Sequence, residues 1–223
     1  MNASILEIKG LFPNVSDAAW LKLQEWSRLM REWNGKVNLV SRKDIAQLEQ
    51  RHLSHCLAIT HVLELQAGAR VLDVGTGGGL PGLPMAICYP QAQFTLVDSV
   101  GKKIKVVSDI CQHLNLTNVQ VFHQRVEALH GYYDFVTGRA VTALPLFINW
   151  IHNKLCRGTA NSIENGLLYW KGGALELELE AAGIVPNQVY PLSRWLEDPY
   201  FGEKYIVHIG AEKLKAVKGF QSN

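Results

Sequence analysis

The stretch Val71-Leu72-Asp73-Val74-Gly75-Thr76-Gly77-Gly78-Gly79-Leu80-Pro81-Gly82 joins an apolar strand directly to a turn that is dense in glycine. Glycine adopts positive φ angles without a Cβ clash and lets a ligand approach the backbone closely. A turn of this kind between a buried strand and a helix is typical of nucleotide-type cofactor sites. We therefore expect an α/β fold with a cofactor at the carboxyl end of this strand.

Two cofactor classes fit the turn. Residues 77–82 have the Gly-x-Gly-x-x-Gly spacing of dinucleotide sites, and Asp98 follows at roughly the expected distance of about 20 residues. Pro81, however, lies inside that pattern. Residues 73–77, Asp-x-Gly-x-Gly, instead resemble the first motif of S-adenosylmethionine-dependent methyltransferases, whose cofactor carries cationic groups that favour a carboxylate such as Asp73. An NAD-dependent oxidoreductase and a glycine turn without a ligand stay open as alternatives.

The residues after Ala69 alternate between short apolar strands and helices, which indicates a parallel sheet with helices on both faces. Asp98 ends the second strand, where its two carboxylate oxygens suit the hydroxyls of a ribose. Arg139 follows the fourth strand at the same edge, so we expect it to lie over the site. We expect strands at 71–74, 94–98, 119–122, 133–137 and 166–170, an antiparallel pair at 185–192 and 205–209, and helices at 83–88, 101–114, 141–155 and 175–182.

Two helices are expected before the sheet. The first opens at Ser16, and its apolar residues recur every three or four positions, which predicts a buried stripe of Trp20, Leu23, Trp26, Met30 and Trp33. The second begins after a cap at residues 41–44 and runs to about Leu63. We divide the chain into an N-terminal helical extension (1–66), an α/β domain of the methyltransferase type (67–212) and a basic tail (213–223).

Composition bounds the class of protein without selecting a substrate. A net charge of +2 is compatible with nucleic acid but too small to demonstrate it. The first residues lack a signal-peptide pattern, and apolar runs are too short to span a membrane, so we expect a cytoplasmic protein without a membrane partner. The four cysteines have no Cys-x-x-Cys spacing, so we expect no metal site and assign them to packing: Cys56, Cys88, Cys111 and Cys156.

Seven short matches along the chain resemble the glucose-inhibited division protein B family, also called ribosomal RNA small-subunit methyltransferase G. They cover nearly the whole length in order, and this order makes the resemblance specific. The matches are Trp33-Asn34 with Asn38-Leu39, Arg51-His52, residues 71–84, residues 96–103, residues 125–127, residues 138–140 and Lys171-Gly172.

The resemblance implies a Rossmann-like class I S-adenosylmethionine-dependent methyltransferase fold, with a seven-stranded, mostly parallel sheet and helices on both faces. It implies that S-adenosyl-L-methionine serves as methyl donor for N7 of a guanine in 16S small-subunit ribosomal RNA, either as RNA or in an assembling 30S subunit. We also expect the protein to be a monomer. The residues that it assigns to the cofactor are Asp73, Gly75, Gly77, Leu80, Asp98, Ser99, Val100, Val126, Glu127 and Arg139. It also assigns Arg139 to the catalytic site, near the methyl group and the guanine. A catalytically silent RNA-binding or ribosome-assembly factor on the same scaffold is the remaining alternative.

The chain departs from the family pattern near the second helix and in one loop. His55 and Cys56 stand where the pattern has Asp-Ser, Gly138 stands where serine is frequent, and residues 157–165 form a longer loop. These changes concern local contacts of the second helix and of the loop rather than the cofactor site. The reaction at guanine N7 needs no general base, because N7 already has a free lone pair.

Overall fold

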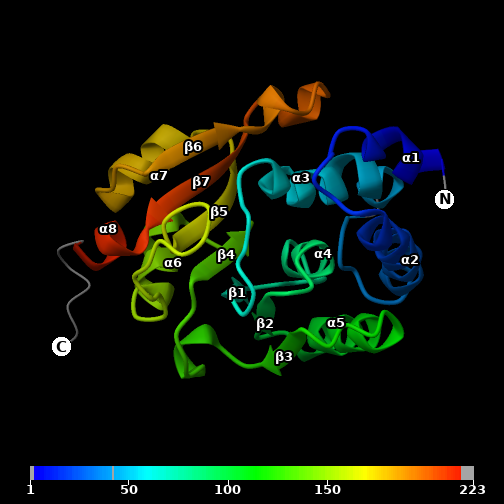
Figure 1. Cartoon of the computed structure of the whole chain (residues 1–223), viewed down its shortest axis with the longest axis horizontal. Helices are drawn as coiled ribbons and strands as arrows, with labels where there is room; N and C mark the ends of the chain where they lie inside the picture. The colour runs from blue at the N-terminus through cyan, green and yellow to red at the C-terminus, as the bar shows by residue number, and fades with distance from the viewer. Residues whose placement is uncertain (1–2, 42, 217–223) are drawn as a thin grey trace.

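The computed structural model describes residues 3–41 and 43–216, and a seven-stranded sheet with the order β3-β2-β1-β4-β5-β7-β6 forms its centre (Figure 1). The strands are β1 (Arg70–Val74), β2 (Gln93–Asp98), β3 (Val119–His123), β4 (Phe135–Arg139), β5 (Gly166–Gly172), β6 (Gln188–Pro191) and β7 (Lys204–Gly210). The first five strands are parallel, whereas β7 runs antiparallel to both β5 and β6. The expected seven-stranded, mostly parallel sheet is confirmed.

Successive strand residues enter two separate hydrophobic clusters, one on each face of the sheet. On β1, Val71 belongs to the first cluster and Leu72 to the second; on β2, Leu96 and Val97 divide in the same way. This alternation follows from the two-residue period of a strand. Both faces are apolar because helices cover both.

The helices divide between these two faces (Figure 1). One face is covered by α1 (Ala3–Lys9), α2 (Asp17–Asn34), α3 (Ser54–Leu57), α4 (Gly82–Cys88) and α5 (Gly101–His113). The opposite face is covered by α6 (Leu144–Ile151), α7 (Leu175–Ala182) and α8 (Ala211–Ala216). In the described residues no helix has the length and apolarity needed to cross a membrane.

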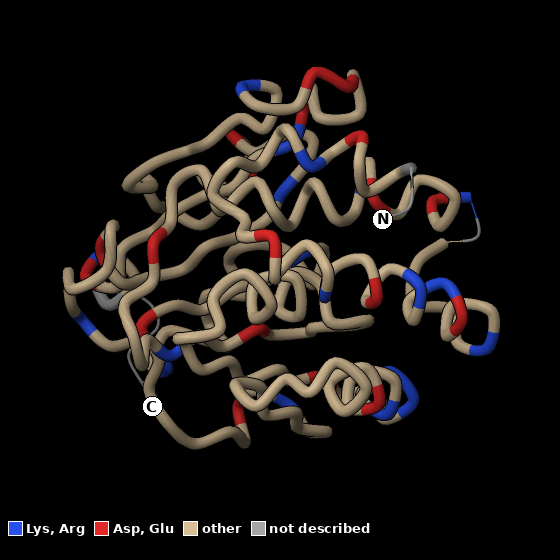
Figure 2. Tube along the Cα trace, turned by 45° about the vertical axis from the view of Figure 1, so that its right-hand side comes forward, with Lys and Arg blue, Asp and Glu red and all other residues tan. Residues whose placement is uncertain are grey.

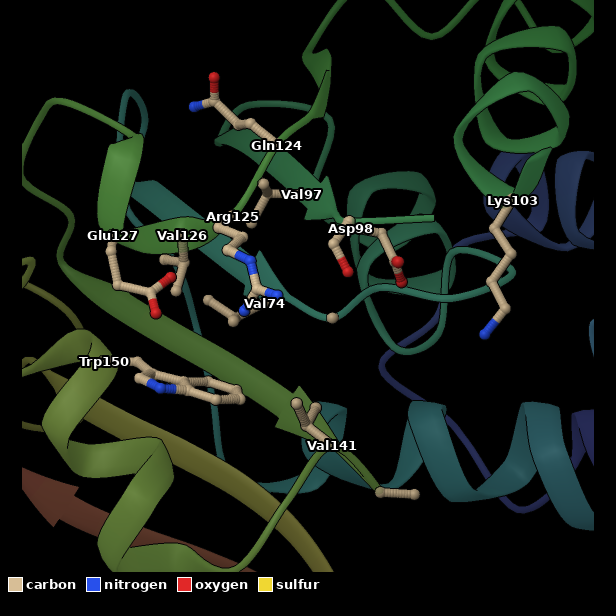
Figure 3. A pocket seen from close by; sticks show the side chains of 13 residues that line it. Val74, Val97, Asp98, Lys103, Gln124, Arg125, Val126, Glu127, Val141 and Trp150 are labelled. Atoms are coloured by element: carbon tan, nitrogen blue, oxygen red, sulfur yellow. The ribbon is translucent and has the colours of Figure 1, made fainter. Parts of the chain in front are cut away.

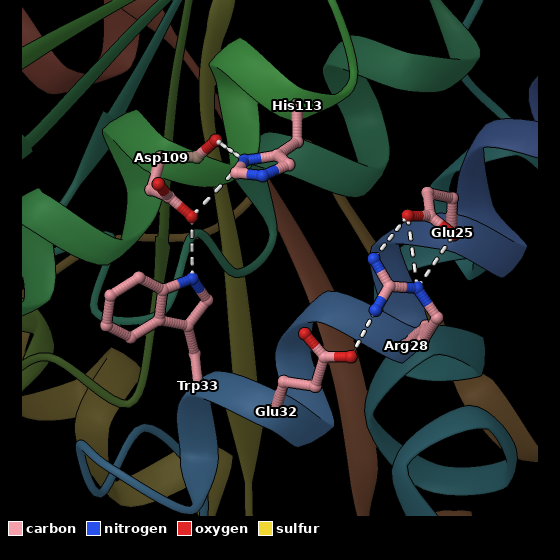
Figure 4. A network of polar contacts seen from close by, with 6 residues as sticks. All are labelled: Glu25, Arg28, Glu32, Trp33, Asp109 and His113. Atoms are coloured by element: carbon pink, nitrogen blue, oxygen red, sulfur yellow. Dashed lines mark hydrogen bonds and ion pairs between the residues drawn. The ribbon is translucent and has the colours of Figure 1, made fainter.

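Helix α2 packs its predicted stripe into the core and is tied to α5 by polar contacts. The Ser16 hydroxyl caps it by accepting from the Ala19 N–H at 3.2 Å. Trp33 is half-buried at the end of the stripe, and its Nε1–H donates to Asp109 Oδ2 on α5 at 2.8 Å (Figure 4). Trp20, Leu23, Trp26 and Met30 are buried as expected.

Figure 4 also shows the exposed polar side of α2, where Arg28 lies between Glu25 and Glu32. On α5, the imidazole of His113 lies 3.3 Å from the Asp109 carboxylate that accepts the Trp33 bond. The N-terminal helices thus share a hydrophobic cluster with the sheet and a polar contact with α5.

The second expected helix is helical but not continuous. It consists of the 3₁₀ turn η1 (Ile45–Gln47), the π turn η2 (Leu48–Leu53), the short helix α3 and the 3₁₀ turn η3 (Ala58–His61). The π turn contains Glu49, whose buried carboxylate accepts hydrogen bonds from Ser27 and, at 2.5 Å, from Arg31 on α2. Ser54 Oγ donates to the Glu49 carbonyl at 3.0 Å. The bonds from Ser27 and Arg31 are tertiary contacts, and together with the local Ser54 bond they stabilise a π turn where a regular helix was expected.

Other boundaries also differ from expectation. The predicted helix 141–155 is shorter, because Pro145 lies at the first helical positions, where its missing N–H is tolerated. The fourth strand is shifted toward Arg139, since Tyr133 forms only an isolated bridge with Leu155. Of the predicted tail 213–223, residues 213–216 belong to α8 and the remainder lies outside the described residues. Three short turns complete the fold: η4 (Val126–Ala128), η5 (Leu192–Arg194) and η6 (Pro199–Phe201).

Candidate active site

The glycine turn after β1 is folded around the buried carboxylate of Asp73. Asp73 Oδ2 accepts hydrogen bonds from the Thr76 hydroxyl at 2.5 Å and from the Gly82 N–H at 3.1 Å. Its Oδ1 accepts one from the Thr137 hydroxyl at 2.8 Å, so the end of β1 is tied to both α4 and β4. A Cβ at Gly82 would lie 2.6 Å from Asp73 Oδ2, so the packing of the turn itself requires this glycine. Burial raises the pKa of Asp73 to about 6.

Asp98, at the carboxyl end of β2, holds the glycine turn from the other side. Its Oδ2 accepts from the Gly77 N–H and its Oδ1 from the Val100 N–H, each at 2.8 Å. Gly77 has a φ of 59°, in the left-handed region that favours glycine. Because a carboxylate oxygen accepts more than one hydrogen bond, Asp98 keeps acceptor capacity for the hydroxyls of a ligand.

A cavity of about 290 Å³, here called the cofactor cavity, opens at the carboxyl ends of β1, β2 and β4 (Figure 3). This position is the topological switch point, where β2 lies on one side of β1 and β4 on the other. Gly75 lines the cavity with a φ of 65°, and a Cβ there would meet the Val141 methyl groups at 3.0 Å. The cavity walls combine apolar side chains with charged and polar ones, among them Asp98 and Glu127, which suits a ligand with a ribose and a planar base.

Half of the residues predicted for the cofactor line this cavity, and half do not. Those in its walls are Gly75, Asp98, Ser99, Val126 and Glu127. Asp73, Gly77, Leu80, Val100 and Arg139 are outside its lining. The first two shape the glycine turn, Leu80 is buried, and Val100 is exposed and contacts Asp98 through its backbone.

Sequence reasoning missed several residues of the wall. The Trp150 ring, from α6, lies across the cavity from Val126 (Figure 3). Trp150 had no sequence signal, because its place depends on how α6 packs on the sheet. Val74 and Val97 could have been predicted from the sequence, because they lie next to Gly75 and Asp98 at the ends of β1 and β2.

Arg139 lines a second cavity of about 310 Å³, here called the Arg139 cavity. Ala140 lines both cavities and has a φ of 54°, unusual for a residue with a side chain. This left-handed turn at the end of β4 separates Arg139, on one side, from Val141, on the other. The cavity's other walls come from the π turn and α3, the end of β5, the turn η6 and the start of β7: His52, His55, Trp170, Lys171, Gly172, Tyr200 and Lys204.

Two neutral histidines contact this cavity. Arg139 Nη2 donates to His52 Nδ1 at 3.2 Å, an assignment that places the imidazole proton on Nε2. Burial, followed by the Arg139 guanidinium, lowers the pKa of His52 to about 4, and the same two causes lower that of His55. His55, one of the departures from the family pattern, is buried, and its backbone carbonyl accepts from Trp170 Nε1 at 2.7 Å.

The family model described as rRNA small subunit methyltransferase G matches residues 20–183 of the chain. The chain belongs to this family. Three relatives named ribosomal RNA small subunit methyltransferase G agree with this membership. The one from Christiangramia forsetii is 43% identical over 202 residues, covering 91% of this chain and 95% of the relative. The relative from Flavobacterium johnsoniae is 42% identical, over 91% of this chain and 96% of the relative. The relative from Porphyromonas gingivalis is 39% identical, over 91% of both chains.

Solved structures share the fold at low sequence identity. A SAM-dependent methyltransferase from Aquifex aeolicus superposes with a TM-score of 0.54 at 16% identity, over 75% of this chain and 97% of that one. The [4+2]-cyclase SpnF also has a TM-score of 0.54, at 18% identity, over 85% and 81% of the two chains. The Rossmann-like class I methyltransferase fold is therefore confirmed. Membership in the methyltransferase G family also decides between the two cofactor classes, in favour of S-adenosyl-L-methionine over NAD.

Proposed function

We propose that the chain transfers a methyl group from S-adenosyl-L-methionine to N7 of a guanine in 16S small-subunit ribosomal RNA. The family membership supports the reaction class. The structural observation that supports methyl transfer is a shared wall: Ala140 lines both the cofactor cavity and the Arg139 cavity. A methyl donor on one side and a guanine on the other would meet at this wall.

The residues of the cofactor cavity fit this methyl donor. Asp98 accepts hydrogen bonds from the ribose hydroxyls with the capacity left by its two backbone donors. Asp73 and Gly77 act by shaping the turn that receives the ligand. When bound, the cofactor supplies a methyl carbon activated by an adjacent sulfonium. The remaining assignments are Gly75 and Leu80 on the methionine side, Ser99 and Val100 at the ribose and base, and Val126 and Glu127 beside the adenine.

The reaction requires the protein to align guanine N7 with the methyl carbon, and it requires no proton transfer. Guanine N7 carries a lone pair at physiological pH, so no general base is needed. Arg139 donates a hydrogen bond to guanine O6 and keeps N7 aimed at the shared wall. Alignment of this kind lowers the barrier by several kcal/mol, of the roughly 7–11 kcal/mol available to well-oriented reactants.

The proposal extends to the partner and the oligomeric state. Small-subunit ribosomal RNA, free or in an assembling 30S subunit, presents the guanine. We also propose that the chain acts as a monomer.

Calorimetric titration with S-adenosyl-L-methionine and, separately, with NAD tests the cofactor assignment. We expect the methyl donor to bind with a Kd of about 1–100 μM, equivalent to roughly 5–8 kcal/mol, and Asp98→Ala to lose this binding. Asp17→Ala is the matched control, since Asp17 is exposed on α2. Binding of NAD with none of the methyl donor would overturn the proposal.

Incubation of small-subunit RNA with the chain and labelled methyl donor tests the reaction itself. We expect 7-methylguanosine in the nucleoside digest. Arg139→Ala should lower its formation about 100-fold or more, as loss of an aligning donor does elsewhere, while S-adenosyl-L-methionine still binds. Tight cofactor binding without any labelled RNA would favour the silent assembly-factor alternative.

A further inference from the structure

The charge of the Arg139 cavity exceeds what the reaction at N7 requires. The chain as a whole carries a net charge of only +2, and Figure 2 shows its basic and acidic residues intermixed along the trace. Yet Arg139, Lys171 and Lys204 all line this one cavity. Lys171 is paired with Glu178 at 2.5 Å, whereas neither Arg139 nor Lys204 forms an ion pair within residues 3–41 and 43–216.

The Tyr200 ring lies between Lys204 and a further cation, Arg51. The Lys204 ammonium lies 4.4 Å from the centre of the Tyr200 ring, and the Arg51 guanidinium lies 4.8 Å from the same centre. Cation–π contacts of this kind orient a cation without cancelling its charge. Lys204 therefore remains free to pair with an anion.

The neighbouring titratable groups do not neutralise the cavity. His52 and His55 are neutral, and His52 orients Arg139 by accepting from its Nη2. The Asp44 carboxylate raises the pKa of His52 electrostatically, but Asp44 does not line the cavity and accepts a hydrogen bond from Ser41. The Arg139 guanidinium interacts electrostatically with Asp73, but the Asp73 carboxylate is buried behind the glycine turn.

We propose that Lys204 forms a phosphate site in the Arg139 cavity, where it binds a backbone phosphate of the RNA beside the target guanosine while Arg139 holds the base. The inference rests on the proposed function, because it places the guanine at the Ala140 wall of the same cavity. Arginine and lysine are the side chains that pair with phosphate most effectively. Gripping the phosphate draws the nucleotide into the concave site, so one cavity both positions the base and holds its backbone.

The salt dependence of methylation tests this site. Each phosphate contact contributes about 0.7 (single strand) to 0.9 (duplex DNA) to the slope of log affinity against log salt, so losing one lysine contact lowers that slope by up to about 1. We therefore expect Lys204→Gln to reduce the salt slope of kcat/KM on small-subunit RNA by about 0.7–0.9 between about 50 and 200 mM salt, and to lower kcat/KM about five- to tenfold near 0.1 M. Lys204→Arg should restore most of both values, because the charge is kept.

A matched control separates this site from a general loss of charge. Arg157→Gln also removes one cation, but Arg157 pairs with Glu212, which follows the carboxyl end of the antiparallel strand β7. That end of β7 lies beside the start of β5, at the edge of the sheet opposite the cavities, so Arg157→Gln should keep the wild-type slope.

The outcomes separate the phosphate site from the proposed function. A misfolded fraction of Lys204→Gln would lower kcat/KM equally at every salt concentration and leave the slope unchanged. An unchanged slope for Lys204→Gln, with an active wild-type chain, therefore overturns the phosphate site alone. Absence of methylation by the wild-type chain would instead overturn the proposed function.

Discussion

Asp73 and Asp98 end neighbouring strands, yet only Asp98 lines the cofactor cavity. Asp98 is nearly buried but keeps a face toward the cavity, whereas Asp73 is fully buried and bonds three partners in the fold. A buried carboxylate needs such donors, because burial without them is costly. Asp73 thus holds the glycine turn, whereas Asp98 also faces the cavity beside it.

Gly82 lies so close to Asp73 that a side chain at position 82 should destabilise the fold. We expect Gly82→Ala to lower the free energy of unfolding by about 1–3 kcal/mol, because the added Cβ must push Asp73 or Leu96 aside. Urea denaturation measures this loss. Gly10→Ala is the control, since a Cβ at Gly10 meets nothing within 4 Å. Equal stability of the two variants would show that the turn relaxes freely.

At the scale of the element, the interrupted helix between α2 and β1 illustrates how a tertiary contact overrides a local pattern. The buried Glu49 carboxylate is bonded by Ser27 and Arg31, and the π turn lies at this contact. The same segment contributes His52 and His55 to the Arg139 cavity. The irregular backbone therefore joins the packing of α2 to the second wall of the site.

Removing Glu49 tests the importance of that contact. We expect Glu49→Ala to cost about 2–4 kcal/mol of unfolding free energy, because Ser27 loses its buried acceptor and Arg31 loses its partner. In contrast, Glu32→Ala removes an exposed partner of Arg28 and should change stability by less than about 1 kcal/mol. Chemical denaturation monitored by circular dichroism compares the two. A loss for Glu49→Ala as small as that for Glu32→Ala would contradict this account.

For the whole molecule, buried histidines make stability depend on pH. Burial lowers the pKa of His52 to about 4 and also lowers the pKa of His55, His61 and His208. Below their unfolded pKa of about 6.5, the unfolded chain binds protons that the folded chain does not, so acid favours unfolding. Asp73 acts in the opposite sense, since its pKa is raised to about 6 and the folded state binds its proton first. The histidines outnumber it, so their effect prevails.

We therefore expect the free energy of unfolding to fall as pH decreases from about 6.5 toward 4, with each buried histidine contributing at most about 1.4 kcal/mol per pH unit. Urea titrations at several pH values measure the slope. His52→Gln should flatten it, because this group no longer titrates in the unfolded chain. His130→Asn, at an exposed position, should leave it unchanged. A stability that is flat over this range would contradict the expectation.

The class of fold could be predicted from the sequence alone, because local patterns specify it: alternating apolar strands, amphipathic helices, and glycines that permit the turn after β1. The sequence also placed Asp98 and Arg139 at strand ends, since parallel strands end at one edge of a sheet. The tertiary structure decided which of these strand-end residues share a cavity. Trp150, His52 and Lys204 come from separate elements, so only packing brings each to its wall. The neutral state of His52 likewise follows from burial beside Arg139, and burial is a property of the assembled chain rather than of neighbouring residues in its sequence.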